Sequence, residues 1–229
     1  MRKLGLIGGL SWYSTRSYYD YINRGVQARA GIRHSAPLLI ESLDFAGLMR
    51  LSEAADWDRA AQELSASAQR LEAAGATAII IGANSMHKVF DRVASSVGVP
   101  MIHIAECVGR RMADKGVNKA VLLGTRNVMI DSFYRQKLIA HDIELLAPDL
   151  SVIEALDRII YDELVVGKAS RQSERDLRTI ITTSEQDGAE AVVLGCTELE
   201  MIVDVDANVL PVFDSTKIHC EAAVDWIMG

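Results

Sequence analysis

The chain has 229 residues, of which 49% are hydrophobic and 24% charged, so it holds enough apolar material for one large core or two smaller ones folded as a unit. Its formal net charge is -7, and its 24 Lys and Arg are scattered among acids, whereas nucleic-acid binding needs clustered cations. This balance argues against a nucleic-acid partner and favours small molecules or proteins.

The first predicted element lies at the very start of the chain. Met1-Arg2-Lys3 leads into the apolar run 4–7 and then into Gly8-Gly9, which is too short a run for a signal peptide. No later stretch approaches the roughly 18 consecutive apolar residues that a membrane span requires. We therefore expect a soluble cytoplasmic protein that makes no membrane contact.

Short β-branched runs alternate with longer amphipathic segments along the whole chain, which is typical of the strands and crossover helices of a parallel sheet. Most of these runs are apolar on both faces, as buried parallel strands are. Ser151 followed by Glu154 fits a capping box that opens a helix running toward Leu164. The predicted strands are Lys3–Gly8, Pro37–Glu41, Ala78–Gly82, Met101–Ile104, Ala120–Gly124, Glu144–Leu146, Ala191–Gly195 and Val209–Phe213.

Three segments of the chain recur in order and at nearly constant spacing. Residues 75–85 align without gaps on 188–198, residues 5–9 match 121–125, and residues 100–103 match 211–214. One such match would be weak because parallel strands look alike, but three in order indicate a duplicated chain. We expect an α/β fold of two lobes, each a parallel sheet of about four strands flanked by helices, the first lobe formed by 1–97 plus 210–229 and the second by 98–209.

The duplication places Ala83 and Cys196 at matching strand ends. Ligands of open α/β sheets bind outside the carboxyl ends of the strands, so these two positions are expected to face each other across a cleft. The thiol also precedes Thr197-Glu198-Leu199, which could open a helix whose N-terminus favours the thiolate. The competing interpretation is a small buried hydrophobic residue, which is the common fate of a free cysteine.

The other two cysteines, Cys107 and Cys220, lie in helical segments and are interpreted as packing residues. The three cysteines have neither metal-like spacing nor a sensible disulfide pairing, so all are expected to be free thiols. No His, Asp or Glu cluster has metal-ligand spacing, so no metal is expected. His87 and His103 follow strands and are either catalytic or structural.

Small polar side chains and a Gly-Gly turn follow several of the predicted strands. Gly8-Gly9 lacks both the dinucleotide-binding glycine pattern and the P-loop lysine, so a tight turn under a carboxylate-sized ligand fits it better. The polar residues at strand ends could surround an anionic group, although any one of them alone is more often a turn or cap residue. They are Asn84, Ser85, Thr125 and Thr197.

Specific motifs extend over essentially the whole chain. They are GLIGGLSWYST at 5–15, NSMHK at 84–88, LGTR at 123–126, IYDEL at 160–164 with GK at 167–168, LGCTEL at 194–199, and PVFD at 211–214 with IH at 218–219. In these motifs the chain resembles the aspartate/glutamate racemase family. The resemblance implies a racemase of acidic amino acids that needs no cofactor and no PLP. It also implies two pseudosymmetric Rossmann-like lobes with the active site between them, and a homodimer.

The same resemblance implies roles for individual residues. In that family two opposed residues, normally cysteines, flank the substrate Cα; one removes the α-proton as a thiolate and the other returns a proton from the opposite face. Cys196 matches the second-lobe cysteine. The positions implied to bind or border the substrate are Ser11, Trp12, Thr15, Asn84, Ser85, Thr125, Lys168, Thr197 and Glu198, with Lys168 reaching the distal carboxylate.

The sequence departs from the family pattern at Ala83, which occupies the position of the first-lobe cysteine. Alanine has no transferable proton, so the two-base mechanism implied by the resemblance cannot operate with this residue as one of the two bases. Ser85, His87 or an ordered water could supply the second proton, the chemistry could be one-sided, or the position could be engineered or inactivated. Three functions stay open: a racemase-like isomerase of aspartate, glutamate or a related carboxylate, a one-cysteine decarboxylase, and a non-catalytic acidic-amino-acid binding protein.

Overall fold

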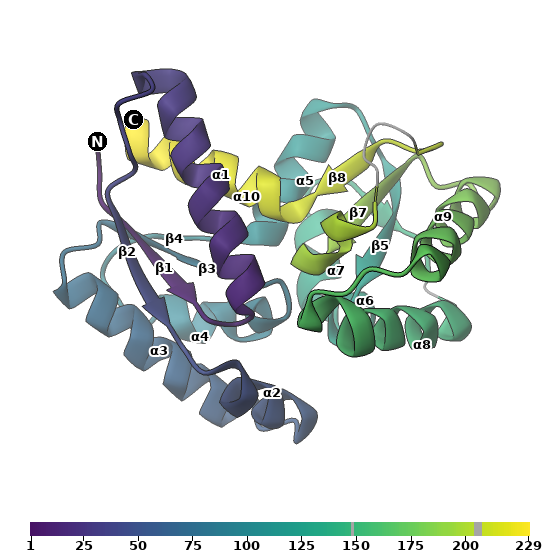
Figure 1. Ribbon diagram of the computed structural model, residues 1–229, viewed down its shortest axis with the longest axis horizontal. Helices are drawn as coiled ribbons and strands as arrows, with labels where there is room; N and C mark the ends of the chain where they lie inside the picture. Colours follow the sequence, from purple (N-terminus) through teal and green to yellow (C-terminus); the bar gives the residue numbers. More distant parts are fainter. Residues whose placement is uncertain (148, 204–207) are drawn as a thin grey trace. The chain divides into compact units, whose positions relative to one another are not determined.

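The computed structural model describes residues 1–147, 149–203 and 208–229. The chain divides into two compact units: unit 1 comprises Met1–His103 with His219–Gly229, and unit 2 comprises Ile104–Ile218. Each unit contains a parallel four-stranded sheet flanked by helices (Figure 1). The α/β fold class and the two four-stranded sheets expected from the sequence are therefore confirmed.

All eight predicted strands are present, with bounds that differ by a few residues from the expected ones. The order in unit 1 is β2-β1-β3-β4 and the order in unit 2 is β6-β5-β7-β8. The strands are β1 (Leu4–Gly8), β2 (Leu38–Ser42), β3 (Ala78–Ile81), β4 (Met101–Ile102), β5 (Lys119–Gly124), β6 (Glu144–Leu145), β7 (Ala191–Gly195) and β8 (Val212–Asp214).

The two sheets repeat one topology in local detail. The Thr77 N–H donates to the Lys3 carbonyl oxygen at 2.8 Å, and the Glu190 N–H donates to the Lys119 carbonyl oxygen at 2.9 Å. Gly75 and Gly188, which precede these donors, have φ angles of 94° and 91°, a conformation that favours glycine. The repeated segments found in the sequence thus occupy equivalent strands and turns.

Helices cover both faces of the unit 1 sheet (Figure 1). One face packs Ile7 and Ile81 against α2, α3 and α4, and the other packs Leu6 and Ile80 against α1 and α10. Successive strand residues point to opposite faces, so β1 and β3 must be apolar throughout. The helical segments of unit 1 are α1 (Trp12–Ala30), α2 (Phe45–Glu53), α3 (Trp57–Ala73), η1 (Ser85–Val89), α4 (Phe90–Ala94) and α10 (Ser215–Met228), whose first residues belong to unit 2.

Unit 2 is built in the same way. The face that presents Leu123 and Leu194 packs against α8 and α9, and the contacting pair α5 and α7 covers the other face (Figure 1). Its helical segments are α5 (Ile104–Asp114), α6 (Arg126–Ile130), α7 (Ser132–Ile139), α8 (Leu150–Arg158), η2 (Ile159–Glu163), η3 (Leu164–Val166), α9 (Arg171–Gln186) and η4 (Thr197–Met201). Within 1–147, 149–203 and 208–229, no helix has both the length and the apolar character needed to cross a bilayer.

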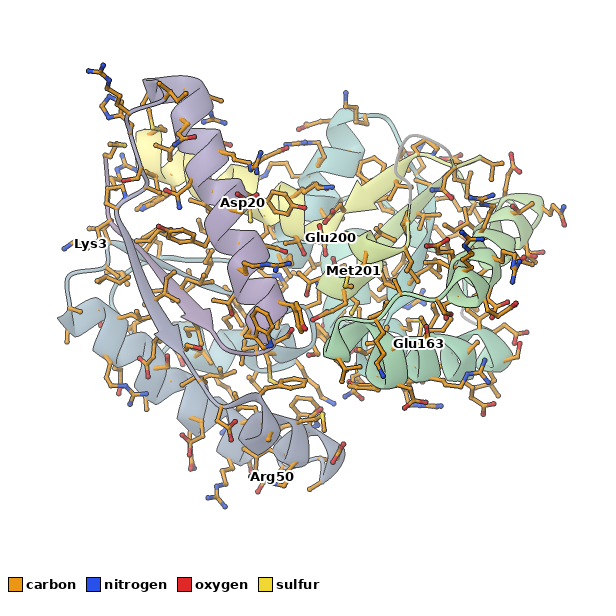
Figure 2. The ribbon with its side chains drawn as sticks, viewed as in Figure 1. Lys3, Asp20, Arg50, Glu163, Glu200 and Met201 are labelled. Atoms are coloured by element: carbon orange, nitrogen blue, oxygen red, sulfur yellow. The ribbon has the colours of Figure 1, made fainter. Side chains whose placement is uncertain are left out.

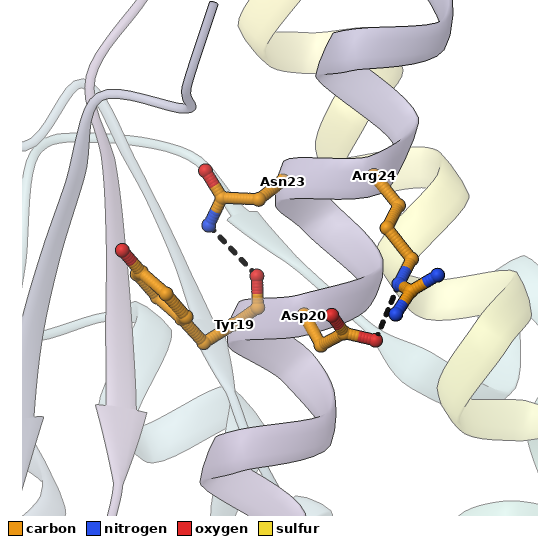
Figure 3. A network of polar contacts seen from close by, with 4 residues as sticks. All are labelled: Tyr19, Asp20, Asn23 and Arg24. Carbon is orange, nitrogen blue, oxygen red and sulfur yellow. Dashed lines mark hydrogen bonds and ion pairs between the residues drawn. The ribbon is translucent and has the colours of Figure 1, made fainter. Parts of the chain in front are cut away.

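The outer face of α1 carries contacts between residues one turn apart (Figure 3). The Arg24 guanidinium donates to the Asp20 carboxylate at 2.7 Å, and the Asn23 amide donates to the Tyr19 carbonyl at 2.8 Å. The Asn23 side-chain oxygen also accepts the backbone N–H of Ala36 at 3.0 Å. The exposed ion pair contributes little to stability, whereas the contact with Ala36 ties α1 to the segment that leads into β2.

The start of α8 corrects the predicted capping box. The N-cap residue is Asp149, whose carboxylate accepts the backbone N–H of Ser151 at 2.7 Å. An N-cap residue must precede the first helical turn, and Ser151 already lies inside it. The expected run to Leu164 is also interrupted, because the α-helix ends at Arg158 and continues as a π turn and then a 3-10 turn.

The unit boundaries lie later in the chain than the expected lobe boundaries, which were 97/98 and 209/210. β4 lies beyond residue 97 yet pairs with β3, and β8 lies beyond residue 209 yet pairs with β7. The expected division would have removed the fourth strand from its own sheet in both units. Backbone pairing therefore moves the two crossings of the chain to His103/Ile104 and Ile218/His219.

The tight turn after β1 yields a stability prediction. Gly9 has a φ of 73°, and a Cβ placed there would overlap the backbone of Leu43. Gly116 has nearly the same φ, 70°, but open space surrounds it. We expect Gly116→Ala to lower the unfolding free energy by roughly 1–2 kcal/mol, the penalty of left-handed backbone, and Gly9→Ala to lower it by clearly more. Urea denaturation of both variants measures this, and equal losses would contradict it.

Candidate functional site

Each sheet has a point at which the chain switches sides of its first strand. β2 lies on one side of β1 and β3 on the other, and β6 and β7 flank β5 in the same way. Ligands of open α/β sheets bind outside the carboxyl ends of strands at such a point. The loops that follow β1, β3, β5 and β7 are therefore where functional groups are expected.

The loop after β1 is braced by Thr15. The Gly9 N–H donates to Thr15 Oγ1 at 2.8 Å, and the Thr15 hydroxyl donates to the Ser11 carbonyl at 3.1 Å. A Cβ at Gly8 would lie 2.8 Å from the Thr15 methyl, so the glycine permits this close approach. The hydroxyl of Thr15, a predicted substrate-binding residue, thus forms its hydrogen bonds within the loop itself. The Ser11 hydroxyl is buried and has no hydrogen-bond partner among the described residues.

Asn84 lies after β3, at the same edge of unit 1 as Ser11. Its side chain is 4% exposed, and neither its amide nitrogen nor its amide oxygen has a hydrogen-bond partner in the described part of the chain. Burying an amide without partners costs about 1–3 kcal/mol. The neighbouring Ala83 is also buried and presents only a methyl group, while Ser85 is half-buried at the start of η1. Unit 1 therefore carries two uncharged polar groups without partners among the described residues, the Asn84 amide and the Ser11 hydroxyl, in the loops at its switch point.

His87 contacts this turn from inside unit 1. Its Nδ1 lies 2.7 Å from the Ala83 carbonyl oxygen, and because a carbonyl only accepts, Nδ1 carries the hydrogen. The ring stacks on Phe90, with centroids 5.5 Å apart and planes 8° apart, and meets His103 at 4.7 Å. Burial, and then the nearby His103 and His219, hold the pKa of His87 well below its ordinary value. His87 and His103 are thus packed inside unit 1.

His219 completes this ring cluster, and in the sequence it stands out only as part of the IH motif at 218–219. Its Nδ1 lies 2.8 Å from the Tyr18 hydroxyl and its Nε2 lies 3.0 Å from the Ile102 carbonyl. The carbonyl requires Nε2–H, so the hydroxyl donates to Nδ1 and the ring is neutral. Burial lowers the pKa of His219 to about 4. The sequence around His219 does not indicate that its ring lies near the rings of two other histidines, because those residues come from distant segments.

Cys196 lies directly after β7 in unit 2. Its Sγ is 3.2 Å from Glu198 Oε2, so the thiol donates to the carboxylate. Burial, and then the charge of Glu198, raise the pKa of the Cys196 thiol well above its ordinary value. The expected influence of the helix N-terminus is present, because the N–H groups of Glu198 and Leu199 lower the pKa of the thiol, but the helix is a 3-10 helix of five residues and burial outweighs this effect. The side chain also contacts the apolar cluster of unit 2.

Two threonines lie close to Cys196 along the edge of the unit 2 sheet. Gly124 pairs with Gly195 across β5 and β7, so Thr125 and Cys196 follow paired residues. Thr125 Oγ1 is buried and lacks a hydrogen-bond partner within the described segments, while Thr197 is buried beside the cysteine. Unit 2 therefore brings a hydroxyl, a thiol and a carboxylate to its switch point.

Lys168 and Trp12 lie in more exposed positions. Lys168 is exposed in the loop before α9, where Glu163, labelled in Figure 2, accepts the Ser173 hydroxyl at 2.8 Å and the Ser170 N–H at 3.2 Å. Trp12 is 59% exposed, with its ring 3.9 Å from that of Tyr13. Among the residues described, no group of three or more His, Cys, Asp or Glu side chains is placed to hold a metal ion.

The chain is similar to proteins of one known family. The family described as Asp/Glu/Hydantoin racemase matches residues 7–223. A candidate Asp/Glu racemase from Yersinia pestis is 42% identical with a TM-score of 0.93, and an aspartate racemase homologue from Pyrococcus horikoshii OT3 is 34% identical with a TM-score of 0.87; each comparison covers 100% of both chains. The broad specificity amino-acid racemase RacX of Bacillus subtilis strain 168 is 22% identical over 169 residues, which are 74% of this chain and 73% of RacX.

The contact between Cys196 and Glu198 predicts how the thiol titrates. Glu198→Gln removes the negative charge that opposes the thiolate, so the pKa of Cys196 should fall and iodoacetamide should alkylate Cys196 at lower pH. Peptide mass spectrometry across a pH series separates this thiol from Cys107 and Cys220. Glu200→Gln, which changes a charge in the same short helix, is the matched control. Identical Cys196 profiles in the two variants would contradict the assignment.

The buried histidines predict a loss of stability in acid. His219 has its pKa near 4 in the folded protein and near 6.5 in the unfolded chain, so between these values the unfolded state binds the extra proton. The unfolding free energy should therefore be fully retained above pH 7 and fall as the pH drops from 6.5 toward 4, by about 3 kcal/mol for this residue. Urea denaturation at stepped pH tests this. His219→Gln should flatten the dependence, and a wild-type stability that stays constant between pH 7 and 5 would rule it out.

Proposed function

Because the chain belongs to the Asp/Glu/Hydantoin racemase family, we propose that it is a cofactor-independent isomerase that exchanges the α-proton of aspartate, glutamate or a related small carboxylate. The observation that carries the substrate class is the set of buried, unsatisfied, uncharged polar groups at the switch points: the Ser11 hydroxyl, the Asn84 amide and the Thr125 hydroxyl. Donors of this kind suit an anionic carboxylate, which brings its own charge. A cytoplasmic location and a homodimer belong to the same proposal.

Cys196 is the acid/base group of this proposal, and Glu198 is its proton partner. In the resting state the proton is on sulfur, in a 3.2 Å contact with the Glu198 carboxylate. Transfer of that proton to Glu198 Oε2 leaves the thiolate that removes the α-proton of the substrate. The reverse transfers restore both groups. In this role Glu198 acts on the cysteine, in place of the substrate-binding role implied by the family resemblance.

Ala83 makes the proposed chemistry asymmetric. Its methyl group offers no proton, and the Nδ1–H of His87 is engaged by the Ala83 carbonyl. The half-buried Ser85 hydroxyl or a water molecule then supplies the second proton. A general acid or base contributes about 10²–10⁴-fold to a rate, so turnover with one strong group should be slow and should favour one enantiomer.

Deuterium exchange tests this function. In D₂O the wild-type protein should incorporate deuterium at Cα of aspartate or glutamate, faster from one enantiomer, and Cys196→Ser should reduce the exchange on the order of 10²-fold or more. Ala83→Cys should raise racemisation by a similar factor, because it restores a second thiol. Proton NMR measures the deuterium exchange, and chiral chromatography measures the racemisation. No exchange from any enantiomer in wild type, with Cys196→Ser equally silent, would reject the proposal.

Ala83 also favours a second candidate function, decarboxylation. A single thiol that protonates a planar intermediate from one face suits a decarboxylation, because that reaction needs no base on the other face. Release of CO₂ from malonate-type substrates by the wild-type protein, abolished in Cys196→Ser, would select this candidate. Affinity for an acidic amino acid without exchange or CO₂ release, unchanged in Cys196→Ala, would indicate a binding protein.

A further inference from the structure

Two hydrogen bonds from His87 brace the turn that carries Asn84. The His87 N–H donates to the Asn84 carbonyl oxygen at 3.1 Å, and His87 Nδ1 donates to the Ala83 carbonyl oxygen at 2.7 Å. These two carbonyls belong to the peptide planes on either side of the Asn84 Cα. The orientation of both planes fixes the direction of the Asn84 Cα–Cβ bond, and the side chain itself makes no hydrogen bond within the described residues. The direction of the Asn84 amide is therefore set through His87.

The His87 ring is itself fixed on several sides. Phe90 stacks on it at 5.5 Å, and the rings of His103 and His219 meet it at 4.7 and 5.7 Å. His219 is in turn held by the Tyr18 hydroxyl and by the carbonyl of β4. His103 ends the first segment of unit 1 and His219 begins its second. The ring cluster thus connects the Asn84 turn to segments of unit 1 that are distant in the sequence.

We infer that His87 is a positioning residue for the carboxylate-binding Asn84, acting through its Nδ1–H bond to the Ala83 carbonyl. The inference rests on the proposed function, because it assigns a substrate carboxylate to Asn84. His87 is not a proton donor to the substrate in this arrangement, since its Nδ1–H is directed at the backbone. Loss of the Nδ1 donor should reorient Asn84 and weaken carboxylate binding, while the acid/base chemistry of Cys196 in unit 2 stays intact.

Three variants separate positioning from general packing. His87→Leu keeps bulk and removes the donor, whereas His87→Asn keeps a donor near the place of Nδ1. Val89→Ala removes buried volume from the same 3-10 helix without touching either carbonyl. Calorimetric titration with aspartate and glutamate should give about tenfold weaker affinity for His87→Leu, equivalent to ~1.4 kcal/mol. His87→Asn should restore most of the affinity, and Val89→Ala should leave it within about twofold. The loss in deuterium exchange should appear in KM more than in kcat.

A ligand-free measurement keeps this inference separate from the proposed function. The side-chain ¹⁵N–¹H signals of Asn84, assigned with Asn84→Asp, should shift or broaden in His87→Leu and stay near their wild-type positions in His87→Asn and Val89→Ala. Unchanged Asn84 signals in a folded His87→Leu protein would overturn the inference whether or not any ligand binds. Equal affinity of wild type and His87→Leu would also overturn it. Failure of the wild type to bind or exchange any acidic amino acid, with the NMR result as expected, would reject the function and keep the positioning role.

Discussion

The parallel pairing of β1 with β3, repeated between β5 and β7, determines where the candidate functional groups lie. Parallel strands end at the same edge, so residues that follow paired positions are brought together although they are far apart in the chain. Ser11 and Asn84 lie in the loops beyond one such edge, and Thr125 and Cys196 directly follow the paired glycines at the other. The core requires these strands to be apolar on both faces, which leaves their carboxyl ends as the first positions where polar groups can be placed.

Burial dominates the electrostatics of both edges. It raises the pKa of Cys196 and lowers the pKa values of His87 and His219, so each group is held in its neutral form. Unit 1 presents hydroxyl and amide groups at its switch point, and unit 2 presents the Glu198 carboxylate, which contacts the thiol. An anionic substrate would add the next charge to these surroundings.

The two copies of the duplicated unit have diverged where their chemistry differs. The offset that pairs Ala83 with Cys196 also pairs His87 with Glu200, so the residue that braces the first turn has no imidazole counterpart in the second. The ends of β4 and β8 differ in the same way. His103 joins the ring cluster, whereas Asp214 accepts the backbone N–H groups at the start of α10, at 2.9 Å from Thr216. One copy uses this edge to fix a backbone turn, and the other carries the thiol and the carboxylate.

The pattern of apolar runs and repeats determined the α/β class, all eight strands and the duplication, because buried parallel strands must be apolar throughout and must recur with the copied unit. The motifs likewise marked Cys196 and Ala83. The pairing of β4 and β8 with their own sheets, the ring cluster around His219, the cap at Asp149 and the protonated state of Cys196 were decided only by the tertiary structure. Each depends on which groups from distant segments meet, and on how far the packed chain excludes water from them, and neither can be read from the order of the residues.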